Sequence, residues 1–119
     1  MGKSIPDAII DLMLAEAEST QIHVCSAEPA NFAGIAAVEL AEAAISGSYS
    51  KANGDTSGRK NTTPAQSAIS ISASGTATHV VESNGTDTML KVTTCTSQAL
   101  TSGGTVDVPV YAHEIGDPS

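Results

Sequence analysis

Apolar residues recur at helical spacing near the start of the chain and predict one N-terminal helix over residues 1–20. Ser4 is a favourable N-cap residue, Asp7 follows three positions later in a capping-box pattern, and Pro6 fits the first turn. We expect the apolar side of this helix to cover a sheet of its own domain, with contact to a neighbouring subunit as the alternative. That side consists of Ile5, Ile9, Leu12 and Met13.

After residue 20 the pattern changes to short runs rich in β-branched residues, separated by turn sequences. These predicted strands cover residues 22–26, 68–72, 76–82, 87–94 and 105–115. The sequence SNGT at residues 83–86 predicts a hairpin, because Asn and Gly tolerate positive φ. GSYSKANGDTSGRKNTT predicts a second hairpin, with Asn53, Gly54 and Asp55 at its tip.

The segment FAGIAAVELAEAAIS, residues 32–46, fits two patterns. Its many alanines suit a helix, whereas every second residue from Ile35 to Ile45 fits one face of a strand. We assign it to a strand because a glycine-rich turn region follows and the later segments are β-like.

Together these elements predict one mainly β domain over residues 1–119. We expect a β-sandwich or a flattened small barrel of about seven strands at residues 21–119, preceded by one N-terminal α-helix. Aromatic residues are only 3% of the chain, so its core must be built from Ala, Val, Ile and Leu. Such a thin core suggests that contacts with other subunits contribute to stability.

The charge balance narrows the possible partners. Thirteen acidic and five basic residues give a net charge of −8, which repels nucleic acid and anionic lipid. The chain carries neither a signal segment nor an apolar run long enough to cross a membrane, so we expect it to remain in the compartment where it is made. For Cys25 and Cys95 we favour two free, buried thiols over one disulfide.

The stretch NGDTSGRK superficially resembles a phosphate-binding loop. It has three residues between Gly54 and Gly58 where the motif needs four, Arg59 stands in the place of the lysine, and Pro64 follows where a helix should begin. We therefore interpret the glycines, and the neighbouring Lys60, as parts of a turn.

Two stretches of the sequence show a partial metal-ligand spacing, and both are incomplete. His23 and Cys25 lie two apart on a strand and would bind zinc if His79 or Cys95 joined them, but the paired close spacings of structural zinc sites are missing. We favour a buried thiol beside a half-exposed imidazole.

Asn53, Asp55 and Ser57 alternate like the oxygen ligands of a calcium loop, yet Pro64 occupies the position of the required bidentate acid.

No sequence feature indicates catalysis. The chain is rich in Ser and Thr but contains no G-x-S-x-G elbow, and hydroxyl side chains are common on strand surfaces. The carboxylate pairs Glu16/Glu18 and Glu39/Glu42 are interpreted as solubilising surface charges. We predict no enzymatic activity and no cofactor.

Several stretches resemble small virion proteins of tailed bacteriophages and prophages. They are VCSAEP (24–29), NGDTSGRK (53–60), SGTATHVV (74–81), VTTCTSQALTSGGTV (92–106) and the terminal PVYAHEIGDPS. The most specific portion is TTCTSQ followed by LTSGG and the ending E-I-x-D-P. The family usually shows an aromatic residue, then an acidic and an aliphatic one, after the strand proline. Here Pro109-Val110 is followed by Tyr111, Ala112 and His113, so contacts made by that edge are expected to differ.

The resemblance implies a non-enzymatic virion component, and for so small a chain a capsid decoration, or cement, protein on the outside of the shell. Its implied partners are the major capsid protein and copies of itself, with a trimer favoured by capsid symmetry. A tail or head–tail connector subunit is the alternative, and a cytosolic binding domain is an alternative of another class. The interface residues we expect are Ile5, Ile9, Leu12, Met13, Val108, Val110 and Tyr111.

Overall fold

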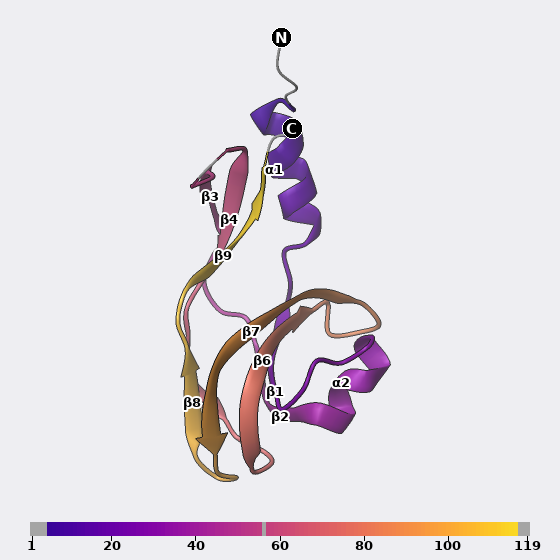
Figure 1. Cartoon of the computed structure of the whole chain (residues 1–119), viewed down its shortest axis with the longest axis vertical. Helices are drawn as coiled ribbons and strands as arrows, with labels where there is room; N and C mark the ends of the chain where they lie inside the picture. Colours follow the sequence, from indigo (N-terminus) through magenta and orange to yellow (C-terminus); the bar gives the residue numbers. More distant parts are fainter. Residues whose placement is uncertain (1–4, 56, 117–119) are drawn as a thin grey trace. The chain divides into compact units, whose positions relative to one another are not determined.

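The structure is a computed structural model that describes residues 5–55 and 57–116 (Figure 1). The fold is mainly β, with 50% strand and 15% helix, and an N-terminal helix precedes the strands, as predicted. Within the described residues there are nine strands, and all of their pairings are antiparallel. The number exceeds the expected seven partly because the run at residues 105–115 forms two strands, separated at Pro109, which has no N–H to donate.

The chain forms two compact units, because residues contact one another mainly within each unit. The first unit combines residues 1–18, 46–65 and 109–119, and the second combines residues 19–45 and 66–108. Each unit is therefore assembled from segments that are far apart in the sequence.

The first unit contains helix α1 and a three-stranded sheet in the order β3-β4-β9. Their bounds are Asp7–Glu16 for α1, Ser50–Asn53 for β3, Arg59–Thr63 for β4 and Tyr111–Ile115 for β9. The helix contacts β4 and β9 and buries Ile10 and Leu14. It therefore covers a sheet, as expected, but with different side chains from those predicted. The sequence has apolar residues on two sides of this helix, and only packing decides which side is covered.

The start of α1 also differs from the prediction. Pro6 occupies the N-cap position, no side chain caps the helix there, and Asp7 is the first helical residue. The predicted cap, Ser4, lies outside the described residues.

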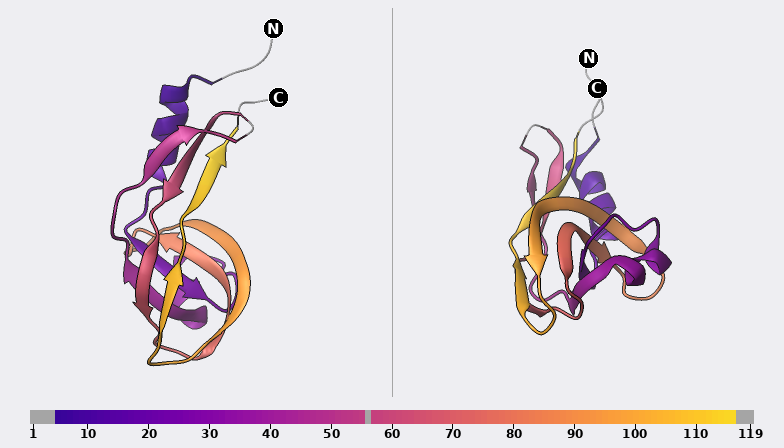
Figure 2. Two further views of the ribbon diagram at one scale, coloured as in Figure 1. Left: turned by 90° about the vertical axis from the view of Figure 1, so that its left-hand side faces the viewer. Right: turned by 60° about the horizontal axis from the view of Figure 1, so that its bottom comes forward.

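The second unit contains a four-stranded sheet in the order β2-β1-β6-β7 and a two-stranded sheet of β5 and β8. The strands are β1 (Gln21–Cys25), β2 (Glu39–Ala44), β5 (Gln66–Ser70), β6 (Gly75–Ser83), β7 (Met89–Leu100) and β8 (Thr105–Val108). β6 and β7 run side by side and curve together (Figures 1 and 2). A bridge between Ala41 and Ile71 adds a contact beyond the named strands. The buried hydrophobic residues are Ile, Leu, Val, Ala and Cys, as the composition predicts.

Residues 32–46 are half helix and half strand, so the prediction of a continuous strand was wrong. Helix α2 spans Phe32–Val38, and β2 begins at Glu39. Asn31 caps the helix, because its side chain accepts a hydrogen bond from Gly34 N at 2.9 Å. This local cap outweighs the alternating pattern that we followed in the sequence.

Both predicted hairpins are confirmed. β6 and β7 pair on either side of the SNGT turn, where Gly85 has φ 75°. β3 and β4 pair on either side of the second turn, where Gly58 has φ 68°. Such left-handed conformations favour glycine, so Gly58 of the supposed phosphate loop serves the turn, and Gly54 N donates to Gly58 O across it at 2.9 Å.

Candidate functional site

A buried histidine lies at the centre of the most promising site, which belongs entirely to the second unit. His23 on β1 is 3% exposed. Its Nε2 lies 2.8 Å from the hydroxyl oxygen of Ser83 on β6, and that oxygen also accepts a hydrogen bond from Gly85 N at 3.1 Å. These contacts fix the ring, so its other nitrogen has a defined direction. The sequence had suggested a half-exposed imidazole, which was wrong.

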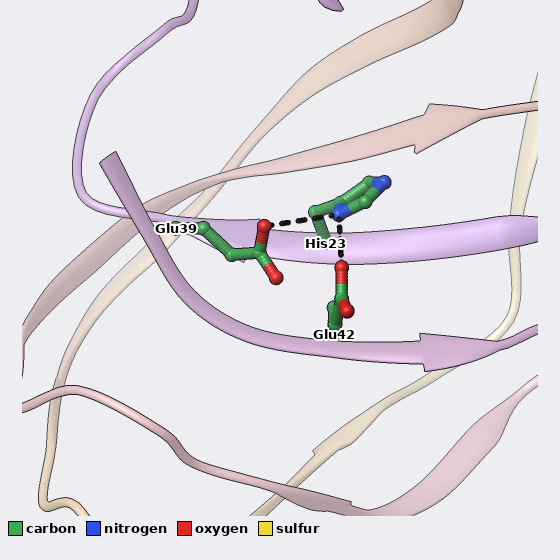
Figure 3. Close-up of side chains that lie close together, drawn as sticks. All are labelled: His23, Glu39 and Glu42. Carbon is green, nitrogen blue, oxygen red and sulfur yellow. Dashed lines mark ion pairs between the residues drawn. The ribbon is translucent and has the colours of Figure 1, made fainter. Parts of the chain in front are cut away.

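Two carboxylates approach that other nitrogen. Nδ1 of His23 lies 3.5 Å from Oε2 of Glu39 and 3.4 Å from Oε2 of Glu42, both on β2 (Figure 3). No hydrogen bond reaches Nδ1 from any residue that the structure describes. The imidazole therefore presents a buried, unsatisfied nitrogen to two acidic side chains.

A β-bulge brings the two glutamates together. Side chains three positions apart on a regular strand point to opposite faces. Here His23 pairs with Glu42, Val24 with Ala41, and Cys25 with Glu39, so β2 has one residue more than β1 across this stretch. The extra residue shifts the alternation of side chains along β2 by one position. Both carboxylates therefore lie on the face of the sheet that carries His23.

The cluster opens into a pocket of about 350 Å³. One wall is α2, and the other walls come from β1, β2 and the SNGT turn. The lining residues are Gln21, His23, Phe32, Ala33, Ile35, Ala36, Glu39, Glu42 and Gly85. Glu39 is mostly buried, at 16% side-chain exposure, whereas Glu42 is 52% exposed and connects the pocket to solvent.

Burial in the pocket favours the neutral forms of Glu39 and His23. Burial, a hydrogen bond with Glu42 and the charge of Glu42 together raise the pKa of Glu39 to about 7. Burial also lowers the pKa of His23, although Glu42 opposes this shift. The imidazole is therefore mainly neutral at pH 7, and the arrangement is suited to binding a cation.

The zinc ligands considered from the sequence do not gather around His23. Among the described residues, the group whose ligand atoms come within 4.8 Å of one another is His23, Glu39 and Glu42. Cys25 packs in a core cluster with Ile35 and Val81. Its pKa is raised to about 12, mainly by burial and to a smaller extent by the charge of Glu39. Cys25 is free and buried, as predicted, while Cys95 is free but exposed, so its predicted burial was wrong.

The basic pair of the supposed phosphate loop is occupied by ion pairs within the first unit. Arg59 Nε lies 2.9 Å from Asp11 Oδ1, and Lys60 Nζ lies 2.8 Å from Asp55 Oδ1. Nη1 of Arg59 also donates to Asn53 Oδ1 at 2.9 Å. Asn53 and Asp55, which share the spacing of calcium-loop ligands, therefore serve as partners for these basic groups.

The predicted interface residues differ in exposure. Ile9 is 48%, Leu12 64%, Met13 41% and Val110 60% exposed. Ile5 and Tyr111 are partly buried, and the Tyr111 ring packs edge-on against His113 at a centroid distance of 5.6 Å. Val108 is only 6% exposed and belongs to the core of the second unit.

Sequence reasoning missed the glutamates of the pocket. Glu39 and Glu42 were interpreted as solubilising surface charges because the pair carries no special signal in the sequence. The sequence contains one hint, an acidic pair in an otherwise alanine-rich segment, but neither the bulge nor the partner strand is visible in it.

Comparisons with known proteins give no family assignment. A scan against family models, a search of curated proteins and a search of solved structures each found no match. In the part of the chain that the structure describes, no helix has the length and apolar character needed to span a membrane.

Proposed function

We propose that this chain is a non-enzymatic virion structural protein of a tailed bacteriophage, and that it acts as a capsid decoration protein. In this role it binds the major capsid protein on the outside of the shell, together with copies of itself, and stabilises the particle. The proposal begins from the sequence resemblance described above.

One observation carries the proposal. All four of the exposed large hydrophobic residues found among the described residues belong to the first unit, and three of them lie on α1. Ile9, Leu12 and Met13 follow an i, i+3, i+4 spacing, so they share one face of the helix. A protein with this little apolar core gains stability by covering such a face with a partner.

The charge is compatible with a position outside the shell. The net charge of −8 disfavours contact with packaged DNA, and a protein on the outer surface of a capsid does not contact that DNA. An icosahedral shell also offers repeated symmetric sites at which several copies can share an interface.

A particle assay tests the role. Phage particles with and without the protein are heated, and the temperature at which packaged DNA is released is measured. If the protein binds the shell, it stabilises the shell by mass action, so particles that lack it should assemble but release DNA at a lower temperature. Equal release temperatures, together with tailless particles, would instead favour a connector or tail subunit.

Copy number separates the same alternatives. A quantified gel of purified virions should show on the order of hundreds of copies per particle for a decoration protein and tens or fewer for a connector. Absence from purified virions would favour a cytosolic binding domain.

A helix variant tests the surface. Leu12→Asp places a charge at the most exposed of these side chains and should weaken binding to stripped capsids by about tenfold or more. Ala27→Asp adds the same charge at an exposed position of the second unit, outside α1, and it should bind normally. Equal binding by both variants would contradict a role for this face.

A further inference from the structure

We propose that His23, Glu39 and Glu42 form a binding site for a divalent transition-metal ion, and that Zn²⁺ is the ion that fits best. This site lies wholly within the second unit, and the inference does not depend on the proposed virion role.

The distances suit a tetrahedral ion. Zinc binds imidazole nitrogen and carboxylate oxygen at about 2.0–2.2 Å, so two ligands at a tetrahedral angle are separated by about 3.4 Å. Nδ1 of His23 lies 3.5 Å from the Glu39 oxygen and 3.4 Å from the Glu42 oxygen. All three ligand atoms lie within 4.8 Å of one another, so small rotations of the glutamate side chains would close the site.

The histidine is already oriented as a ligand. Metal-binding histidines usually donate their other N–H to a fixed acceptor, which sets the tautomer and the direction of the ring. Ser83 Oγ, 2.8 Å from Nε2, fits this acceptor role and leaves the lone pair of Nδ1 facing the two carboxylates. Burying this nitrogen without a hydrogen bond is costly, and a metal ion would remove that cost.

The charge and the shape of the pocket agree with this assignment. Two carboxylates side by side in a partly buried pocket repel each other, and a dication between them removes the repulsion. The ligand set leaves a fourth position open to the pocket of about 350 Å³, which has ample room for a water molecule. Calcium prefers six to eight oxygen ligands, so one nitrogen and two carboxylates serve zinc better.

The direct test is metal binding by the intact chain. The protein is treated with a chelator, dialysed against ZnCl₂, and analysed for bound metal. The wild type should bind one equivalent, and Glu42→Gln should bind about tenfold more weakly or worse. Because Glu42 is 52% exposed, this variant should fold normally, which its thermal unfolding will check. Glu28→Gln makes the same charge change at an exposed site outside the pocket and should bind like the wild type.

A second measurement identifies the ligand atom. Nitrogen NMR of the three histidines should show zinc shifting Nδ1 of His23 while its proton stays on Nε2. Ser83→Ala should weaken binding by about 10- to 100-fold without removing a ligand, as expected for a positioning residue.

Three outcomes would overturn the proposal. They are failure of the wild type to bind millimolar zinc, equal binding by Glu42→Gln and Glu28→Gln, and zinc shifts at His79 or His113 without a shift at His23. The second and third outcomes would indicate adventitious surface binding.

Discussion

The interiors of the two units differ in the kind of contact that stabilises them. Of the sixteen buried hydrophobic residues among the described residues, only Ile10 and Leu14 belong to the first unit. The other fourteen lie in the second unit, where strands from distant parts of the sequence pair in the same sheets. The second unit therefore has a conventional apolar core, and the first has very little of one.

Polar contacts take a larger share in the first unit. Asn61 and Thr63 of β4 are fully buried. Nδ2 of Asn61 donates to Glu18 Oε2 at 2.9 Å and reaches the carbonyl of Leu14 at 3.5 Å. Lys51 and Arg59 form ion pairs at the edges of this network, with Glu18 and Asp11. The side chains of both ion pairs remain partly exposed, and solvent weakens such pairs, so we expect the fully buried amide of Asn61 to contribute more to stability.

The comparison suggests a division of roles. The second unit combines an apolar core with the polar pocket around His23. The first unit buries few apolar side chains but exposes four large ones. We therefore expect association with a partner to matter most for the first unit.

The largest expected effect comes from the apolar core of the second unit. Ile22 on β1 is fully buried, so Ile22→Ala should lower the free energy of unfolding by about 2–5 kcal/mol, as measured by urea denaturation. Leu12→Ala, at a 64% exposed position of the first unit, should change it by less than about 0.5 kcal/mol. Equal losses would mean that the two units do not differ in the way described.

A smaller effect is expected from the polar interior of the first unit. Asn61→Ala removes a fully buried amide that donates to the charged carboxylate of Glu18, so it should lower the free energy of unfolding by about 1–3 kcal/mol. Hydrogen exchange should then speed up in α1 and β4 before it does so in β1 and β6. Thr62→Ala, at the next residue of β4 and only partly buried, serves as the control and should leave exchange unchanged.

The smallest effect is expected at the tip of the β3–β4 hairpin. The side chain of Asp55 is 77% exposed and forms an ion pair with Lys60. Asp55→Ala and Lys60→Ala should therefore leave the melting temperature and particle assembly unchanged within error. A clear drop in either would show that the tip has a role beyond closing the turn.

Local sequence features determined much of the secondary structure. The hairpin at residues 83–86 was predictable because Gly85 adopts positive φ and Asn84 Oδ1 accepts hydrogen bonds from the backbone of Thr86, Asp87 and Thr88. These are contacts between neighbours in the chain, so the residues alone encode them. The β-rich character and the N-terminal helix follow from periodicity in the same way.

Tertiary structure decided the buried side of α1 and the composition of the pocket. Two apolar sides compete in the sequence of α1, and packing against β4 and β9 selects the side that contains Ile10 and Leu14. The pocket depends on the pairing of β1 with β2 and on the single extra residue that turns Glu39 and Glu42 to the side of His23. Strand register is set by long-range packing and hydrogen bonding, so a reading confined to neighbouring residues could not bring this histidine and these glutamates together.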